Sequence, residues 1–441
     1  MRWPSRISST SRNPTASAAE WEGRSSRGRP PSGDTKALDL GAKSRQDGAF
    51  PSLASTRMSP FSFSTVAQVI IQTGAAQNIG AILSQRFTPG RVLAVTDKFL
   101  VRSGLLEPAF ASLRAHGWEL LVCDDVEADP PDHVVEKAAA RAREFGATLV
   151  LGVGGGSSMD VAKLVAVLAA SEQPLSAMYG VDKVLGGRLP LVHIPTTAGT
   201  GSEVTPVAIV TTGATTKSGI VARQLYADLA VLDATLTVGL PPAITAATGI
   251  DAMVHAIEAF TSKRLKNPLS DHAATLALKL LSTNLEKVCA NGADLEAREA
   301  MLLGSMLAGQ AFANAPVAAV HALAYPLGGR YHLPHGLTNA LVLPHVLRFN
   351  ALTHPDGYAE LGAALGLAQT GTVAERAAAF IAHIVALIER TALPMRLRDH
   401  GVAEDMIATL AADAMLQERL LMNNPRPLTV DDALAIYSAA Y

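Results

Sequence analysis

The chain changes its pattern of apolar residues at Pro241-Pro242, and this change constrains the fold more than any other feature. Before it, from about residue 65 to 235, short apolar runs of strand length alternate with stretches of helical periodicity. Such alternation is typical of a parallel sheet covered by helices. After it, nearly every segment has helical periodicity and strand signals disappear. We therefore expect an α/β domain over 58–238 and an all-helical domain over 239–441.

The first part contains several elements that can be placed individually. Glycines end the predicted helices, and ligands of such sheets bind beyond the carboxyl ends of the strands. We expect strands at 91–97, 118–123, 148–153 and 189–194, further candidate strands at 206–212 and 227–233, and helices at 103–117, at 132–146 and from 158. The helices of the second part should be interrupted near 266–268, 315–317, 326–334 and 424–427.

Length, charge and cysteine content narrow the class of protein. A chain of 441 residues is too long for one hydrophobic core. The formal net charge of -2 gives no reason to expect a nucleic-acid or acidic-membrane partner, and no apolar run reaches the length of a membrane span. Cys123 and Cys289 form no CxxC pair, so neither a disulfide framework nor a cysteine-based zinc site is expected. A reducing, cytoplasmic location fits this.

Residues 1–57 differ from the rest of the chain. They are rich in Ser, Arg, Pro and Gly and show no apolar periodicity, so they cannot bury enough surface to offset the entropy of ordering. They are either a disordered extension or a start assigned too early, with Met58 as the true beginning. An organellar transit peptide is the alternative, but the segment is more acidic than such peptides usually are, with Glu20, Glu22, Asp34, Asp39 and Asp47.

A glycine cluster follows the third predicted strand, at residues 152–157. Glycines let a backbone approach a pyrophosphate closely, and a helix N-terminus offers free N–H groups. The spacing is not GxGxxG, so a flexible strand-to-helix turn is an open alternative. Asp160, early in the next helix, either interacts with the helix dipole or hydrogen-bonds a cofactor.

A second loop, at 195–205, is dense in hydroxyls and small residues, which suits contact with a phosphate and a ribose. An ordinary turn-rich loop is the alternative. Asp97, at the end of the first strand, could accept hydrogen bonds from the adenosine ribose and would repel a 2′-phosphate, which favours NAD over NADP. It could equally cap the following helix, and the two roles are compatible.

The helical part contains candidate metal ligands. Asp251 and His255 are four residues apart and share one face of a helix, where, for the pair alone, an intrahelical carboxylate–imidazole contact is a better explanation than a metal. His321 lies in an apolar helix, where a lone histidine is usually part of the core, and His335 begins another helical stretch. Together the four form a plausible site for one divalent metal, because imidazole suits Fe²⁺, Zn²⁺, Ni²⁺ and Co²⁺ and the carboxylate balances charge.

Several blocks in order resemble the iron-containing (group III) alcohol dehydrogenases, which include lactaldehyde reductase. The likeness covers about 65–441. The blocks are Val95-Thr-Asp-Lys98, GGGSSMDVAK ending at Lys163, PTTAGTGSEVT from Pro195, TAATGIDAMVHAIEAF after Leu240-Pro-Pro, and VHALAYPLGG continuing to LPHGLTNALVLPHV. The 14-residue step from His321 to His335 belongs to this pattern.

The resemblance implies a dehydroquinate synthase-like architecture, with a metal between a dinucleotide domain and a helical domain, and an assembly of two or more copies. It implies an NAD-dependent enzyme that transfers hydride between NAD(H) and a small alcohol, aldehyde or ketone, with iron or another divalent metal such as zinc. By position, the metal ligands are Asp251, His255, His321 and His335. The cofactor contacts are Asp97, Gly155, Gly156, Ser157, Asp160, Thr196, Thr197, Thr200, Thr205 and Lys217.

Tyr325 departs from the family pattern. Many members carry a second histidine here, four residues after the third ligand, near the nicotinamide and the substrate. A phenol can hydrogen-bond or donate a proton, but its unperturbed pKa is about 10. Tyr325 either takes a catalytic part in this form or only shapes the pocket. Because of this departure, the hydroxyacid–oxoacid transhydrogenases of the same family give an alternative function.

Two rival classes remain. A dehydroquinate synthase-like or glycerol-1-phosphate dehydrogenase-like activity needs a basic pocket for phosphate or carboxylates. The segment 316–347 is largely apolar and, beyond the proposed ligands, offers only Arg330, His332 and His345. A non-catalytic metal-binding or scaffold protein would not need the glycine loop and the hydroxyl-rich loop.

Overall fold

The computed structural model describes residues 60–213 and 216–441, so the expectations for residues 1–57 fall outside it. A parallel six-stranded sheet with the strand order β1-β9-β6-β4-β2-β3 is the centre of the first part. Its strands are β1 (Val69–Ile71), β2 (Arg91–Asp97), β3 (Glu119–Val126), β4 (Leu149–Gly154), β6 (Leu191–Pro195) and β9 (Leu229–Leu232). The five longer strands confirm the predicted ones, whereas the short edge strand β1 had not been predicted.

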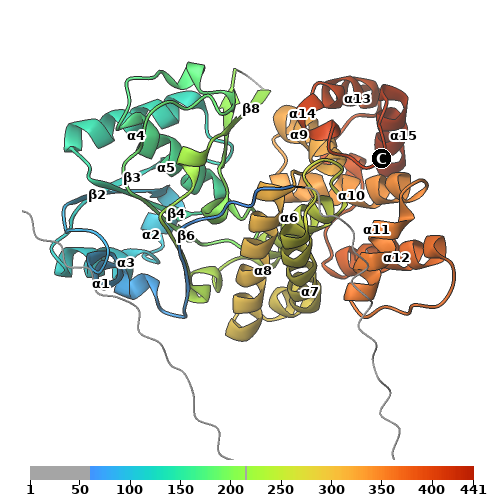
Figure 1. Ribbon diagram of the computed structural model, residues 1–441, viewed down its shortest axis with the longest axis horizontal. Helices are drawn as coiled ribbons and strands as arrows, with labels where there is room; N and C mark the ends of the chain where they lie inside the picture. The colour runs from blue at the N-terminus through green and yellow to red at the C-terminus, as the bar shows by residue number, and fades with distance from the viewer. Residues whose placement is uncertain (1–59, 214–215) are drawn as a thin grey trace, which may run out of the picture. The chain divides into compact units, whose positions relative to one another are not determined.

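Both faces of the sheet are covered by helices, as the alternation of buried residues requires. On β2, Val92 and Ala94 belong to one hydrophobic cluster, and Leu93 and Val95 belong to the other. Helices α1 (Ile79–Ser84) and α3 (Glu107–Ala115) pack on the first face. Helices α4 (Asp132–Phe145) and α5 (Gly156–Leu168) pack on the second, and Figure 1 shows these pairs on opposite sides of the strands.

One predicted helix is wrong in its extent. The segment predicted as a single helix over 103–117 begins earlier and is broken, with α2 (Lys98–Arg102) followed by α3. The break falls at Gly104, whose φ is +73°, a conformation that favours glycine.

The candidate strand at 206–212 exists, but it does not join the main sheet. It is β7 (Val207–Thr212), which pairs antiparallel with β8 (Thr216–Val221), and β8 also pairs with β5 (Gly180–Val181). The alternation in β7 explains this placement, because Ala208 and Val210 are buried while their neighbours are partly exposed. Such half-buried strands suit an antiparallel ribbon with one covered face.

All segments after β9 are helical or irregular. The helices are α6 (Pro242–Thr261), α7 (Pro268–Ala290), α8 (Leu295–Asn314), α9 (Ala319–Tyr331), α10 (His335–Ala351), α11 (Pro355–Ala364), α12 (Val373–Arg390), α13 (Ile407–Met415), α14 (Glu418–Leu421) and α15 (Val430–Ala440). The predicted breaks fall between helices, except that α9 continues through Pro326 to Tyr331. Burial of Leu323 and Leu327 there outweighs the hydrogen bond that a proline removes. Over the described residues, no helix is long and apolar enough to cross a bilayer.

The strand order places a ligand crevice at the carboxyl ends of the central strands. The chain passes from β2 to β3 on one side and then to β4 on the other side of β2. Ligands of open α/β sheets bind at such a switch point. The glycine loop follows β4, and the hydroxyl-rich loop follows the adjacent β6, so both loops lie at this edge. The division between two domains near residue 238 stays a prediction, although the last strand ends at Leu232 and α6 begins at Pro242.

Candidate active site

A cavity of about 210 Å³ is bounded by the loops at this sheet edge and by helices of the second part. Its wall includes ten of the residues that the sequence singled out: Gly156, Ser157, Asp160, Thr200, Thr205, Lys217, His255, His321, Tyr325 and His335. The other five are not part of this wall: Asp97, Gly155, Thr196, Thr197 and Asp251. The structure therefore brings most of both predicted groups to one space.

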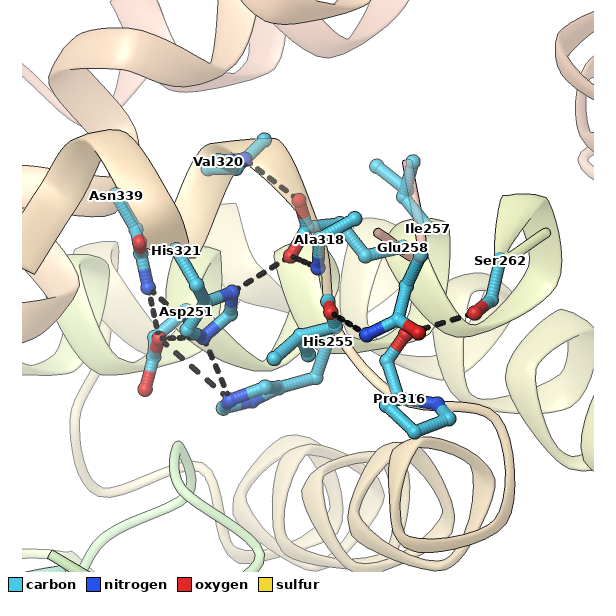
Figure 2. Close-up of polar contacts among 12 residues, drawn as sticks. Asp251, His255, Ile257, Glu258, Ser262, Pro316, Ala318, Val320, His321 and Asn339 are labelled. Carbon is cyan, nitrogen blue, oxygen red and sulfur yellow. Dashed lines mark hydrogen bonds and ion pairs between the residues drawn. The ribbon is translucent and has the colours of Figure 1, made fainter. Parts of the chain in front are cut away.

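Three of the proposed metal ligands form a tight buried cluster. Helix α6 presents Asp251 and His255 on one face, and α9 brings His321 against them (Figure 2). The Nε2 atoms of His255 and His321 are 3.0 Å apart. Asp251 Oδ1 lies 4.0 Å from His255 Nε2 and 3.9 Å from His321 Nε2. One ligand atom from each residue lies within 4.8 Å of the others, which is a spacing that can hold an ion.

His335 lies at the cavity side of this cluster. Its Nε2 is 3.7 Å from Asp251 Oδ1, and its ring centroid is 5.3 Å from that of His321. His335 reaches this position because the start of α10 lies against α6. A Cβ on Gly336 would lie 2.2 Å from the carbonyl oxygen of Ala247, so only glycine allows the two backbones to meet here.

Glu258 fixes the orientation of His321. Its carboxylate accepts hydrogen bonds from His321 Nδ1 at 2.7 Å, from the Val320 amide at 2.6 Å and from the Ala318 amide at 3.0 Å (Figure 2). The amide bonds satisfy N–H groups at the start of α9, which have no partner within the helix. The contact to Nδ1 assigns the ring proton to that nitrogen, so Nε2 presents a lone pair to the cluster.

The protonation states of the proposed ligands favour the binding of a cation. Burial lowers the pKa of His255 to about 4 and that of His335 to about 4, so both rings are neutral at pH 7. Burial alone would raise the pKa of Asp251, but the three histidines and the Asn339 amide outweigh it, and the pKa is lowered. Asn339 Nδ2 donates to Asp251 Oδ1 at 2.6 Å. A buried carboxylate among neutral imidazoles is a donor set that fits Fe²⁺ or Zn²⁺.

The glycine loop forms the opposite wall of the cavity. Helix α5 begins at Gly156, two residues earlier than predicted, so Asp160 lies beyond the first turn. Gly156 and Ser157 are therefore the first two residues of the helix, whose amides have no partner within it, and both residues line the cavity.

Asp160 is bonded chiefly to the protein itself. Its Oδ1 accepts hydrogen bonds from Ser202 Oγ at 2.6 Å and from Lys163 Nζ at 3.2 Å, and its Oδ2 accepts from the Ile209 amide at 2.9 Å. Lys163 is fully buried, and burial lowers its pKa. It also donates to Ser202 Oγ at 2.7 Å. This network ties the glycine-loop helix to the hydroxyl-rich loop.

The hydroxyl-rich loop is held against α8. Gly201 has a φ of +59°, and a Cβ there would lie 2.6 Å from the Cα of Gly309. Thr200 and Thr205 of this loop face the cavity, whereas Thr196 donates its amide to Gly154 and belongs to the loop's base. Glu203 is buried, and burial raises its pKa to about 7.

Two predicted cofactor residues have protein partners. Asp97 caps α2 by accepting a hydrogen bond from the Leu100 amide at 2.9 Å, which is the alternative role that its position allowed. Lys217 of β8 forms an ion pair with Asp129 at 2.6 Å at the cavity wall.

Aromatic side chains line the cavity beside the histidines. Phe312 stacks on His255 with a ring-centroid distance of 4.4 Å. The Tyr325 ring lies 5.9 Å from that of His335, and burial raises the pKa of its phenol. Tyr325 thus stays protonated at neutral pH, and its hydroxyl can donate a hydrogen bond.

Sequence reasoning missed four residues of this site: Glu258, Asn339, Lys163 and Arg419. Glu258 lies three residues beyond His255 and Asn339 lies four residues beyond His335, so helical spacing could have suggested them. Lys163 ends the block GGGSSMDVAK, on which the family resemblance rests, but no role was predicted for it. Arg419 lines the cavity from α14, and no local pattern connects it with the other residues. None of the three basic residues that the sequence offered as partners for a substrate phosphate or carboxylate, Arg330, His332 and His345, lines the cavity.

Both parts of the chain are similar to known proteins. Residues 67–234 match the profile described as iron-containing alcohol dehydrogenase, and residues 245–441 match that of the C-terminal part of the Fe-containing alcohol dehydrogenase family. The long-chain-alcohol dehydrogenase 1 of Geobacillus thermodenitrificans is 41% identical over 362 residues, which is 81% of this chain and 91% of that protein.

Solved structures agree. A 1,3-propanediol oxidoreductase matches with a TM-score of 0.83 at 36% identity, covering 87% of this chain and 100% of that one. A sulfoacetaldehyde reductase from Bifidobacterium kashiwanohense, solved in complex with NAD⁺, matches with a TM-score of 0.77 at 28% identity, covering 87% and 99%. The expected family is confirmed: this chain belongs to the iron-containing alcohol dehydrogenases.

Proposed function

We propose that the protein transfers hydride between NAD(H) and a small alcohol, aldehyde or ketone, with a divalent metal, iron in the first place, as its second cofactor. One observation carries the proposal: His255, His321 and His335 face the same cavity as Gly156 and Ser157 of the glycine loop. The proposed metal site and the proposed phosphate-binding helix terminus thus open onto a single space that can hold a small molecule.

The chain's own residues would place the reactants. Asp251, His255, His321 and His335 would hold the ion, with His321 oriented by Glu258. The start of α5 would bind the pyrophosphate of the dinucleotide through backbone amides. A bound divalent ion would supply Lewis-acid polarisation of the substrate oxygen at these residues, and a bound dinucleotide would supply the hydride acceptor.

The other cofactor positions support the same arrangement. Thr200, Thr205 and Lys217 lie at the cavity wall, where they would contact the nicotinamide half of the dinucleotide. Asp97, Gly155, Thr196 and Thr197 lie at the carboxyl ends of β2, β4 and β6, where the remainder of the dinucleotide would pass. Asp97 uses one oxygen as a cap and would offer the other to the adenosine ribose, which favours NAD.

Tyr325 would donate a hydrogen bond within the reaction space. Its ring lies beside His335, and its raised pKa keeps the proton on the phenol. It would thus take the place of the imidazole that many relatives carry, as a fixed donor rather than as a group that gains and loses a proton near pH 7.

The test is reconstitution of purified protein with Fe²⁺ or Zn²⁺ without oxygen, followed by NADH absorbance with a panel of small alcohols. We expect metal-dependent NADH formation in the wild type. In His321→Ala, we expect loss of both bound metal, by elemental analysis, and turnover. Full activity in a metal-free His321→Ala protein would contradict the proposal.

The assembly and the location are further parts of the proposal. The family tendency toward dimers and larger assemblies supports a homodimer or larger homo-oligomer, which light scattering would test. Cys123 and Cys289 are both free, and this supports a reducing, cytoplasmic location. Fractionation of cells that make the full chain would test it.

A further inference from the structure

Arg419 is an exposed arginine in the wall of the cavity, and it has no ion pair among the residues that the structure describes. Its helix, α14, packs against α9, which carries His321 and Tyr325. Arg419 lines the cavity together with its neighbour Leu420. Its positive charge also opposes the rise that burial causes in the phenol pKa of Tyr325.

Strand β8 shows where the guanidinium lies. Lys217 and Val221 of β8 line the cavity, and Gly219 lies between them on the same face of the strand. A Cβ on Gly219 would come within 3.3 Å of Arg419 Nη2. The guanidinium therefore lies across the cavity face of β8, in space that the glycine leaves open.

The other ionised groups of the cavity wall have partners. Lys217 is paired with Asp129 at 2.6 Å, and Asp160 is bonded to Lys163 and Ser202. Within residues 60–213 and 216–441, the Arg419 guanidinium has neither an ion pair nor a side-chain hydrogen bond. A forked cation at the mouth of a small cavity is suited to a compact oxyanion, which it can bind through two parallel hydrogen bonds.

We infer that Arg419 binds an anionic substituent of the substrate, a carboxylate or a sulfonate. The preferred substrates are then short hydroxy acids or hydroxysulfonates and the corresponding aldehydes or ketones. This inference rests on the proposed function, because it names the substrate class of the same site. Phosphates of the dinucleotide are the other source of oxyanions, but their expected place is the start of α5, on a different wall.

Matched substrates test the inference in the metal-loaded enzyme. The pairs are 4-hydroxybutyrate with 1,4-butanediol, and 2-hydroxyethanesulfonate with 1,2-ethanediol. We expect the wild type to have a kcat/KM for each anion at least about tenfold above that for its neutral partner, as a charged hydrogen bond implies. Arg419→Met should lose about tenfold for the anions and less than about twofold for the diols, and Arg419→Lys should lie between. Arg398→Met removes an exposed arginine of the same helical part that does not line the cavity, and should change neither.

A binding measurement gives a readout apart from turnover. Propane-1-sulfonate added to the enzyme–NADH complex should change NADH fluorescence, and its affinity should fall about tenfold in Arg419→Met. Should Arg419→Met fail to fold by circular dichroism, Arg419→Gln and Arg419→Lys carry the comparison.

Three results would overturn the inference. They are equal use of anions and diols by the wild type, an equal loss for both in Arg419→Met, and a rise in the KM for NAD⁺ with the anion preference unchanged, which would assign Arg419 to the cofactor. Oxidation of diols without an anion preference sinks this inference alone. Failure to oxidise any member of the panel sinks the proposed function and this inference with it.

Discussion

Replacement of Glu258 by glutamine separates the two tasks of its carboxylate, which are to orient His321 and to satisfy the start of α9. The carboxylate accepts three hydrogen bonds, and an amide offers one oxygen and one NH₂ group. In the better orientation, the amide oxygen keeps the bonds from Ala318 and His321. The NH₂ group then faces the Val320 amide, another donor, at the 2.6 Å that the oxygen now occupies.

The expected losses follow from this geometry. One buried N–H is left without an acceptor, which costs about 1–3 kcal/mol of folding free energy. His321 loses its ionised partner, so its Nε2 becomes a weaker ligand. Groups in this position contribute about 10–100-fold to metal affinity, which corresponds to roughly 1.4–2.7 kcal/mol. We therefore expect Glu258→Gln to fold and to bind metal about 10–100-fold more weakly.

The assay is competition for Fe²⁺ or Zn²⁺ against a chelator of known affinity, with urea denaturation of the metal-free protein alongside. Glu286→Gln is the matched control, because Glu286 forms a surface ion pair with Arg390 and its side chain is 53% exposed. An unchanged metal affinity in a folded Glu258→Gln protein would refute the reasoning. It would show that Glu258 serves the helix terminus alone.

Three further predictions concern residues around the cluster and the loops. Gly336→Ala places a methyl group 2.2 Å from the Ala247 carbonyl oxygen, so α10 and His335 must move. Competition with a chelator should then show a metal affinity at least about tenfold lower. The control is Gly239→Ala, which should bind metal normally because an added Cβ there has no atom within 4 Å. Tyr325→Phe should keep its metal content and lose about tenfold in kcat, since it removes one hydrogen bond; an unchanged kcat would leave Tyr325 with only a shaping role. Burial raises the pKa of Glu203 to about 7 in the folded protein, whereas its ordinary pKa is 4.5. Between these two pH values the unfolded chain has released the proton and the folded protein still holds it. The free energy of unfolding therefore falls as pH rises from 4.5 to about 7. Urea denaturation of Glu203→Gln should therefore show a gain over the wild type that grows by about 3 kcal/mol between these pH values, and a constant difference would contradict the buried, protonated carboxyl.

The main sheet was predictable from sequence because its central strands β2, β4, β6 and β9 are buried on both faces. Such strands read as continuous apolar runs separated by helices, and this pattern depends little on distant partners. The second sheet was not predictable in the same way. The pairing of β7 with β8 is a tertiary choice that alternation in one strand does not reveal. The continuation of α9 through Pro326 likewise depends on packing rather than on local propensity, whereas the break at Gly104 is a local glycine signal that the prediction did not use.

In the candidate site, too, some residues were predictable from the sequence and others were not. Asp251 and His255 were found because helical spacing places them on one face, and their meeting with His321 and His335 is what the structure adds. Glu258 lies on the same helix, but its partners begin 60 residues later, so its task is visible only in three dimensions. Arg419 reaches the cavity from near the C-terminus, where sequence reasoning had found no cation of interest.

The four proposed metal ligands lie on three helices that are distant in sequence, α6, α9 and α10. An ion held there is also a cross-link, and its binding free energy is coupled to folding through mass action. At a free metal concentration about 100 times the dissociation constant, this linkage adds about 2.7 kcal/mol to the folded state. The melting temperature would then report metal occupancy without any substrate. Under iron limitation, the protein would lose persistence as well as turnover.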